Sequence, residues 1–285
     1  LSPLPAAYQY LGQTTKAAER LLEIVTAPPA VVFPDASHIS REHFHIHFNQ
    51  VDFRYQESDP WVFQGFNLRI EQGRRVAILG ETGAGKSTLF NLLVRFWDPQ
   101  KGWIQIGGLD LKTFAESDLR QTMGVVSQQA HLFHTTLRKN LLMARPGADE
   151  AALNTALEKA QLLNWVETLP RGIDSWIGEA GSSLSGGQAR RLSLARIFLQ
   201  DAPIWVLDEP FEGLDRVTEQ KIMRTLFQES RSRTLLVITH RTADLERFDE
   251  IILMEAGRVM ARGRHDALLK TNPKYAALVE KGVRE

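Results

Sequence analysis

The chain has 285 residues, enough for one large domain or two small ones. Hydrophobic residues make up 43% and charged residues 24%, an ordinary globular composition that excludes a wholly disordered protein. Its 34 basic and 34 acidic side chains cancel, so we expect no nucleic-acid partner held by phosphate neutralisation. The absence of cysteine excludes a disulfide framework, a thiolate metal site and a thiol nucleophile.

Residues 6–25 place apolar side chains on one stripe and predict an amphipathic helix. Pro28 and Pro29 end this pattern, because proline cannot continue the hydrogen-bond ladder. The helix is either a tail that docks on its own domain or the end of a longer helix. Because the chain begins at Leu1 rather than Met, we expect a fragment of a longer protein. No run approaches the roughly 18 apolar residues of a membrane helix.

From Phe44 the apolar period changes to two, which predicts strands, with a bulge or turn at Asn49–Gln50 where the phase slips. Further runs alternating with helical segments indicate an α/β core with an antiparallel flank. A helical subdomain is expected over about residues 130–200. The strands expected on this basis are 44–48, 51–55, 66–70, 75–79, 204–207 and 235–238, with a hairpin at 251–260 that closes the core.

Residues 80–87 fit the pattern G-x-x-x-x-G-K-[S/T] between a predicted strand and a predicted helix. Glycines let such a loop curl so that backbone N–H groups point inward, and the helix N-terminus adds partial positive charge. Lys86 would neutralise the β- and γ-phosphates, and the Ser87 hydroxyl would ligate Mg²⁺. The residues predicted to bind ATP here are Gly80, Glu81, Thr82, Gly83, Ala84, Gly85, Lys86, Ser87 and Thr88.

The apolar run 204–207 delivers two carboxylates, Asp208 and Glu209, at the end of a predicted strand. Open α/β sheets bind their ligands at this end of the strands. Asp208 is suited to hold magnesium through water. Glu209 points differently and is the candidate that polarises an attacking water.

Residues 184–188 read Leu-Ser-Gly-Gly-Gln and open a predicted helix. Ser185 is a good N-cap and Gln188 completes a capping box, so the motif is compatible with a well-capped helix alone. Two adjacent glycines are costly, however, at about 1 kcal/mol each relative to alanine in a helix interior. The close approach of an anionic ligand would explain them.

The phosphate loop, the Leu-Ser-Gly-Gly-Gln segment and the acidic pair, in this order, resemble the nucleotide-binding domain of ABC ATPases over residues 43–270. Tyr55 resembles the aromatic residue that stacks on adenine in this family. Gln128 resembles the Q-loop glutamine, Asp215 the D-loop aspartate and His240 the switch histidine.

The resemblance implies a P-loop NTPase core of ABC type that binds ATP and Mg²⁺ and hydrolyses ATP. It also implies a head-to-tail dimer with ATP between the phosphate loop of one subunit and the signature of the other, which opens after hydrolysis. The implied catalytic residues are Glu209, His240, Lys86 and Gln128. The implied metal ligands are Ser87, Gln128 and Asp208, and the signature residues acting in trans are Ser185, Gly186, Gly187 and Gln188.

Three segments depart from the usual pattern of the family. Ser127 stands where exporters often have proline. Residues 210–215 read Pro-Phe-Glu-Gly-Leu-Asp instead of Ala-Thr-Ser-Ala-Leu-Asp, which would alter communication between the two sites. Residues 178–181 only partly match the exporter segment that contacts the membrane domain. No catalytic group is removed, so we expect hydrolysis.

Within the family, these features favour the motor domain of a membrane exporter. Residues 1–40 would be the end of a membrane-domain stalk helix plus a linker, and residues 41–285 the ATP-binding domain, at the cytoplasmic face of the bacterial inner membrane. Residues 97–102 and 207–215 are similar to CydC-type subunits of a heterodimeric exporter needed for cytochrome bd assembly. This similarity implies export of cysteine, glutathione or a haem-related compound, with a CydD-type partner half and a membrane-spanning domain in the same full-length chain.

Another lipid, drug or peptide ABC exporter is an alternative. A soluble ABC ATPase of DNA repair or translation fits less well: only 99 positions separate Lys86 from Ser185, and the chain carries one such domain. A P-loop GTPase or kinase is disfavoured, because no Asn-Lys-x-Asp motif occurs and the signature glycines would be unexplained.

Two side-chain groups receive plainer interpretations. His43, His45 and His47 share one strand face, which we interpret as solvated rather than metal-binding, because no carboxylate lies at a defined spacing. Arg190 and Arg191 are either surface charges of the signature helix or contributors to the positive field around the phosphates, and we favour surface charges.

Overall fold

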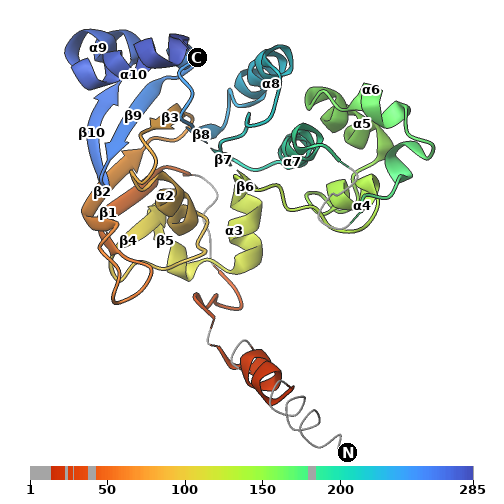
Figure 1. The fold of residues 1–285 in the computed structure, drawn as a ribbon, viewed down its shortest axis with the longest axis horizontal. Helices are drawn as coiled ribbons and strands as arrows, with labels where there is room; N and C mark the ends of the chain where they lie inside the picture. The colour runs from red at the N-terminus through yellow and green to blue at the C-terminus, as the bar shows by residue number, and fades with distance from the viewer. Residues whose placement is uncertain (1–13, 23–24, 28, 38–42, 179–183, 285) are drawn as a thin grey trace, which may run out of the picture. The chain divides into compact units, whose positions relative to one another are not determined.

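The computed structural model describes residues 14–22, 25–27, 29–37, 43–178 and 184–284 (Figure 1). The chain divides into two compact units, residues 1–32 and 33–285. In the first unit, residues 14–22 and 25–26 are helical and Leu21, Leu22 and Val25 are exposed; the rest of the predicted helix lies outside the described residues. Across the described part of the chain, no helix combines the length and apolar character needed to span a bilayer. The domain boundary at residue 40 stays a prediction.

The second unit contains a four-stranded antiparallel sheet in the order β2-β1-β4-β5. The register between β1 and β2 shifts between Phe48 and Val51, and Gln50 has a positive φ of 48°. This irregularity confirms the bulge predicted from the phase slip. The strands are β1 (Ile46–Phe53), β2 (Phe63–Ile70), β4 (Lys101–Ile106) and β5 (Leu109–Asp110).

The second sheet has six strands in the order β10-β9-β3-β8-β7-β6, in which neighbouring strands from β9 to β6 run parallel and β10 pairs antiparallel with β9. The predicted α/β class and the predicted closing hairpin are confirmed. Strands β4, β5 and β6 lie outside the strands predicted from the sequence. The strands are β3 (Arg75–Leu79), β6 (Met123–Val126), β7 (Ile204–Asp208), β8 (Thr234–Ile238), β9 (Glu250–Glu255) and β10 (Arg258–Gly263).

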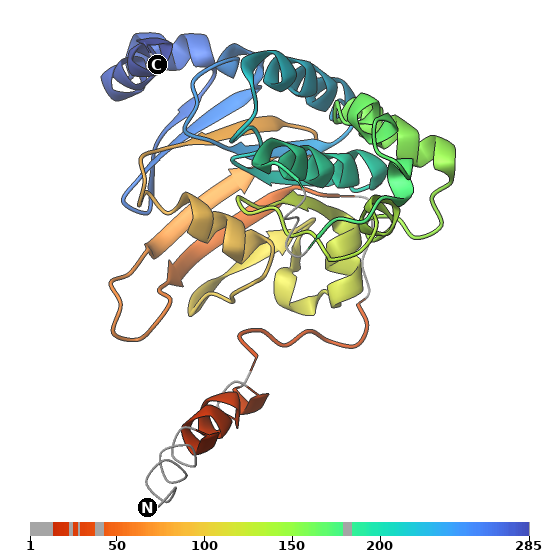
Figure 2. The same ribbon diagram turned by 45° about the vertical axis from the view of Figure 1, so that its right-hand side comes forward.

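Helices cover this sheet and build a separate lobe. In Figures 1 and 2, α4, α5 and α6 (green) lie beyond α7, away from the antiparallel sheet. Residues 137–200 are thus largely helical, as predicted. The α-helices are α2 (Lys86–Leu93), α3 (Glu116–Thr122), α4 (Leu137–Leu142), α5 (Glu150–Lys159), α6 (Leu163–Glu167), α7 (Gly186–Leu199), α8 (Arg216–Glu229), α9 (His265–Thr271) and α10 (Pro273–Arg284). Short 3₁₀ turns are η1 (Leu111–Thr113), η2 (Gly172–Asp174) and η4 (Leu245–Arg247).

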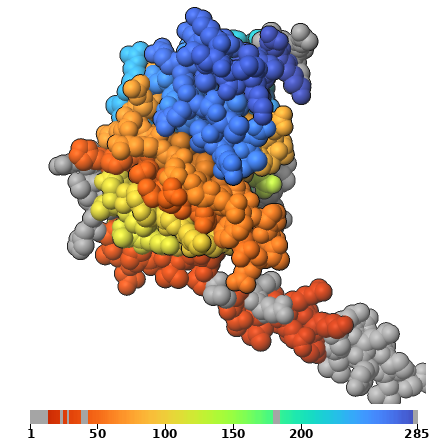
Figure 3. All heavy atoms as spheres, turned by 90° about the vertical axis from the view of Figure 1, so that its left-hand side faces the viewer, coloured from red at the N-terminus to blue at the C-terminus, as the bar shows by residue number. Residues whose placement is uncertain are grey.

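Strand β3 is buried on both faces and separates two hydrophobic cores. Val76 and Ile78 belong to the core that includes α2 and the antiparallel sheet. Ala77 and Leu79 belong to the core that includes α7 and the helical lobe. Alternation of side chains along a strand explains this division. Figure 3 shows the C-terminal segment (blue) on the same face as the orange strands, in agreement with the pairing of β9 with β3. The phosphate loop therefore starts from a strand, β3, that is paired with β9 on one side and with β8 on the other.

Candidate nucleotide-binding site

The candidate site lies at the carboxyl ends of four adjacent parallel strands. The phosphate loop follows β3, Thr239 and His240 follow β8, Glu209 follows β7, and Gln128 follows β6. Parallel strands bring their carboxyl ends to one edge of the sheet, so segments distant in sequence converge there. A cavity of about 490 Å³ lies at this edge. Its lining includes Val62, Thr82, Gly83, Gly85, Lys86, Ser87, Thr88, Gln128, Asp208, Glu209, Glu212 and His240.

The phosphate loop takes a conformation that requires glycine at its end. Gly85 is the N-cap of α2 with φ 97°, and a Cβ atom there would lie 2.9 Å from a ring carbon of Phe63. The Lys86 ammonium donates to the carbonyl oxygens of Gly80 at 2.7 Å and Glu81 at 3.0 Å. The Ala84 N–H donates to the Glu81 carbonyl at 3.1 Å, so this amide is used inside the loop. These two hydrogen bonds hold the Lys86 side chain across the loop that is predicted to bind phosphates.

Lys86 and the acidic pair share a poorly hydrated environment. Burial lowers the pKa of Lys86, and attraction to Glu209 and Asp208 opposes this effect. Asp208 is 5% exposed, and burial together with repulsion from Glu209 raises its pKa to about 6, while Lys86 and Arg190 oppose the rise. Two carboxylates in such a place favour a bound cation. The hydroxyl of Ser87, the amide of Gln128 and the carboxylate of Asp208 line one cavity, and such oxygen donors fit Mg²⁺.

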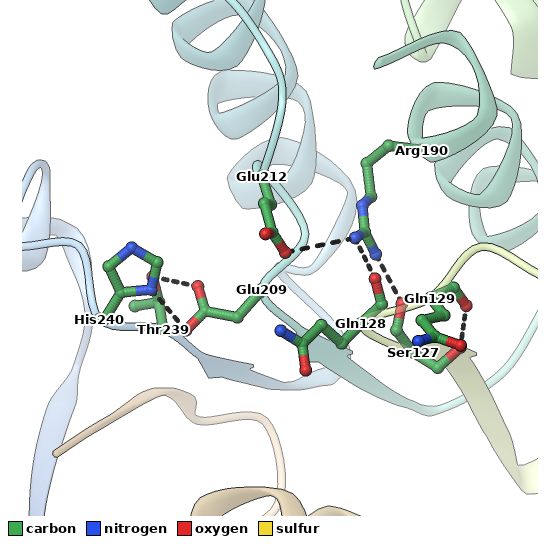
Figure 4. Close-up of polar contacts among 8 residues, drawn as sticks. All are labelled: Ser127, Gln128, Gln129, Arg190, Glu209, Glu212, Thr239 and His240. Atoms are coloured by element: carbon green, nitrogen blue, oxygen red, sulfur yellow. Dashed lines mark hydrogen bonds and ion pairs between the residues drawn. The ribbon is translucent and has the colours of Figure 1, made fainter. Parts of the chain in front are cut away.

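Glu209 is fixed from the neighbouring strand β8 (Figure 4). One carboxylate oxygen lies 2.8 Å from Nδ1 of His240, and the other accepts a hydrogen bond from Thr239 Oγ1 at 3.3 Å. The Glu209 N–H donates to the Ile238 carbonyl at 2.9 Å. Its φ of 47° is unusual for a residue other than glycine, and such strain is concentrated at functional sites. Glu209 and His240, both of which the family resemblance implies as catalytic, therefore lie within hydrogen-bonding distance of each other.

The signature segment forms the predicted capping box. The Gln188 N–H donates to Ser185 Oγ at 3.2 Å, and the Ser185 N–H donates to Gln188 Oε1 at 2.9 Å. A Cβ atom on Gly187 would lie 2.9 Å from the carbonyl oxygen of Gly213, whereas Gly186 has open space around it. An approaching ligand is therefore not needed to explain Gly187, because the chain's own loop fills that space. None of the four predicted signature residues, all of which the structure describes, lines the cavity.

Tyr55 is tied to the site through α2. Its hydroxyl lies 3.1 Å from Thr88 Oγ1 and accepts a hydrogen bond from the Asn91 amide at 3.1 Å. Its ring makes edge contacts with Phe53 and Trp97, at centroid distances of 4.9 and 5.5 Å. These contacts fix the orientation of the ring, and stacking on adenine stays a prediction.

Two arginines on α7 correct the interpretation drawn from the sequence. Arg190 is 6% exposed and donates to the backbone carbonyls of Ser127 and Gln128. Arg191 is half-buried and donates to the Gln161 carbonyl at 2.6 Å. Neither arginine is therefore a free surface charge. The segments that cover them, around residues 127–128 and 161, are distant in sequence, so the helical period alone could not indicate their burial.

Some cavity residues had no sequence-based assignment. Glu212 and Val62 line the cavity, and the only signal for Glu212 was its unusual place in residues 210–215. Asp215, the predicted D-loop residue, caps α8 by accepting from the Thr218 N–H at 2.9 Å. Residues 179–181 of the exporter-like segment lie outside the described residues.

Of the three histidines interpreted as solvated, His43 and His45 precede β1 and His47 is the second residue of β1. In the described parts of the chain, no group of three or more His, Asp or Glu side chains has a geometry suited to a metal. The His47 ring lies edge-on to Trp103 at 4.9 Å, and partial burial lowers its pKa.

The fold and the cavity define an ATP-binding domain of the ABC-exporter type. A family model described as "ABC transporter" matches residues 63–212, and the chain belongs to this family. The family assignment agrees with the order of the phosphate loop, Q-loop, signature and acidic pair along the chain.

Individual relatives refine the comparison. The chain is 42% identical over 275 residues to the glutathione/L-cysteine transport system ATP-binding/permease protein CydC of Escherichia coli, covering 96% of this chain and 48% of that protein. It is 43% identical over 267 residues to the ATP-dependent lipid A-core flippase of Alkalilimnicola ehrlichii, covering 92% and 44%. A bacterial Atm1-family ABC exporter solved with ATP bound matches with a TM-score of 0.87 and 32% identity, covering 99% and 49%. The chain spans about half the length of these relatives.

We predict that Asp208→Asn stabilises the domain in the absence of nucleotide. A carboxyl whose pKa is raised by folding makes the folded state less stable as pH rises from about 4 through 6. At pH 7.5 the amide avoids this cost, so the free energy of unfolding should rise by about 1–3 kcal/mol. Urea denaturation in EDTA at pH 7.5 and pH 4 measures the difference, which should vanish at the lower pH.

Asp215→Asn is the matched control for this experiment. Hydrogen bonds to Thr218 lower the pKa of Asp215, so the sign of its pH dependence is opposite. This variant should gain no stability at pH 7.5. Equal or lower stability of Asp208→Asn at pH 7.5 would contradict the electrostatic account.

Proposed function

We propose that this chain is the ATP-hydrolysing motor domain of an ABC exporter and that its cavity binds ATP with Mg²⁺. The observation that carries the proposal is the convergence, on one cavity, of the phosphate-loop lysine, the acidic pair and the Gln128 amide. The hydrogen bond between His240 and Glu209 completes this arrangement.

The phosphate loop supplies binding. Backbone N–H groups near Gly83 and Gly85 and the N-terminus of α2 attract the triphosphate, and Lys86 exchanges its two carbonyl partners for phosphate oxygens. Tyr55 stands against the adenine. Both helix dipole and ammonium act in a poorly hydrated site, where electrostatic interactions are stronger than in water.

The metal is proposed to be held by Ser87, Gln128 and Asp208. When bound, Mg²⁺ supplies charge neutralisation to the phosphate oxygens. It also balances the two carboxylates that crowd Lys86, which is the electrostatic reason to expect it here.

Hydrolysis is proposed to use Glu209 as the base. Its carboxylate orients an attacking water and accepts the proton, and His240 and Thr239 hold the two carboxylate oxygens in place. The exposed imidazole of His240 would also contact the γ-phosphate. Loss of this phosphate removes a ligand shared with the Ser185–Gln188 segment of a second subunit, so the dimer opens.

At the level of the whole protein, we propose a heterodimeric exporter of cysteine or glutathione that serves cytochrome bd assembly at the bacterial inner membrane. A membrane-spanning domain in the same full-length chain and a CydD-type partner half would complete it. Support comes from the 42% identity to CydC and from the half-length coverage of that relative. The resemblance of residues 207–215, which include Glu212, to CydC-type subunits also supports this proposal.

A lipid exporter is the second candidate. The 43% identity to the lipid A-core flippase of Alkalilimnicola ehrlichii favours it. Both candidates share the same motor chemistry, so the ATP site cannot separate them. They differ in cargo, which the membrane domain selects.

We predict that Lys86→Ala weakens ATP binding about tenfold to hundredfold, the effect of losing charge-assisted hydrogen bonds. Calorimetric titration of the chain with ATP and Mg²⁺ measures the affinity. Lys101→Ala is the control, because that lysine is exposed and pairs with Asp52 in the antiparallel sheet. Unchanged affinity after Lys86→Ala would refute the proposed phosphate site.

We predict that Glu209→Gln keeps ATP binding and loses turnover by a factor of about 100 or more. The amide preserves the shape of the side chain but accepts no proton. Steady-state phosphate release by the full-length transporter, with ATP affinity measured in parallel, tests this separation. A variant with normal turnover would place the base elsewhere.

We predict that the isolated chain is mostly monomeric and hydrolyses ATP slowly, because its facing site belongs to another subunit. Addition of the partner half to full-length protein should raise the rate, and cysteine or glutathione should stimulate it further. Sedimentation and phosphate release measure these effects. A tight homodimer that forms without ATP, or stimulation by lipid A alone, would favour the lipid exporter.

A further inference from the structure

Arg190 connects the signature helix to the Q-loop backbone (Figure 4). It lies in the second turn of α7, and its side chain is almost completely buried. One guanidinium nitrogen donates to the Ser127 carbonyl at 2.6 Å, and another donates to the Gln128 carbonyl. The interaction joins positions more than sixty residues apart along the chain.

These two hydrogen bonds are strong because of where they lie. A buried guanidinium needs partners, since an unpaired buried charge is costly. Hydrogen bonds from a charged donor are roughly twice as strong as neutral ones. The Ser127 hydroxyl adds a bond to the Gln129 carbonyl at 2.6 Å. The backbone at residues 127–129 is therefore fixed, and the Gln128 side chain extends from it toward Glu209, as Figure 4 shows.

Glu212 provides a weaker third contact. Its carboxylate lies 3.8 Å from the Arg190 guanidinium, and its side chain is 54% exposed. An ion pair with this exposure contributes little free energy. Gly187, three residues before Arg190 and on the same helical face, packs against the backbone of Gly213. The face of α7 that carries Arg190 therefore also contacts the loop after β7.

Arg190 thus lies where three segments of the proposed nucleotide site meet. The Q-loop carries Gln128, the loop after β7 carries Glu209 and Glu212, and α7 begins with the signature. Arginine suits this position because its planar fork offers several donors in fixed directions, whereas lysine offers a compact charge.

We propose that Arg190 is a positioning residue of the ATP site, which sets Gln128 through the backbone of residues 127 and 128. In this way it couples the chain's own ATP site to its signature helix, which acts on the ATP of the second subunit. The inference rests on the proposed function for the identity of the ligand. The link that Arg190 makes between α7 and the backbone of residues 127 and 128, which we call the tether, rests only on the contacts of Arg190.

A purely structural role for Arg190 makes different predictions. Arg191 is the natural comparison, because it is the next residue, is half-buried, and bonds to the Gln161 carbonyl. If Arg190 only stabilised the fold, replacing either arginine would change stability and leave the response to magnesium intact.

The first test measures ATP affinity with Mg²⁺ and with EDTA, using a fluorescent ATP analogue and the 285-residue chain. Removing outer-shell support of a metal ligand typically costs tenfold to hundredfold in metal affinity. Arg190→Gln should therefore reduce the magnesium-dependent gain in affinity about tenfold, with the EDTA affinity changed by less than about twofold. Arg191→Gln should keep the full gain.

Two further variants keep the proposal testable if Arg190→Gln folds poorly. Arg190→Lys retains the positive charge but lacks the planar guanidinium group. It should also lose most of the magnesium-dependent gain in ATP affinity. Arg191→Lys is its matched control and should keep the full gain, because Arg191 donates to the Gln161 carbonyl and not to the Q-loop backbone. A full gain in Arg190→Lys or in Arg190→Gln would overturn the positioning role.

The second test needs no nucleotide. Amide hydrogen exchange of a peptide covering residues 123–132 should be about tenfold faster in Arg190→Gln than in wild type and unchanged in Arg191→Gln. Equal exchange in wild type and Arg190→Gln would overturn the tether. Failure of the wild-type chain to bind ATP would instead refute the proposed function, and the exchange result would still decide the tether.

Discussion

The register of three parallel strands sets the positions of the phosphate loop, the acidic pair and the Thr239–His240 segment at the ATP site. Ile238 of β8 pairs with Asp208 of β7 on one side and with Ile78 of β3 on the other. The acidic pair, the Thr239–His240 segment and the phosphate loop therefore leave the sheet at the same level. A one-residue slip would turn each side chain to the opposite face. Burial of these strands on both faces makes such a slip very unfavourable.

The charged groups that suit this site to ligand binding also lower the stability of the folded domain. Asp208 and Glu209 are both buried, and Lys86 is held beside them in a poorly hydrated pocket. Burying these charges is unfavourable, and the proposed nucleotide and cation would balance them. The positive φ of Glu209 adds backbone strain at the same place. Stability and activity often conflict at functional sites. In this pocket the conflict is electrostatic, because the charged groups suited to bind a ligand are the ones whose burial is unfavourable.

The departures from the family pattern acquire a physical context in the structure. Ser127 contributes a carbonyl to Arg190 and a hydroxyl bond to Gln129. Glu212 lines the cavity and faces the same guanidinium. Two unusual residues that lie far apart in the sequence therefore meet at one arginine. Their meeting links the Q-loop, the signature helix and the loop after β7.

The sequence by itself determined the features that depend on short-range patterns. The phosphate loop, the acidic pair at the end of β7, the capping box at Ser185 and the bulge near Gln50 all follow from residues a few positions apart. Tertiary structure alone decided the burial of Arg190, the reason for glycine at position 187 and the place of Glu212 in the cavity. It also decided that β6, a strand of four residues with weak periodicity, carries Gln128 to the site. These features depend on contacts between distant segments, and no local pattern specifies which segments will pack together.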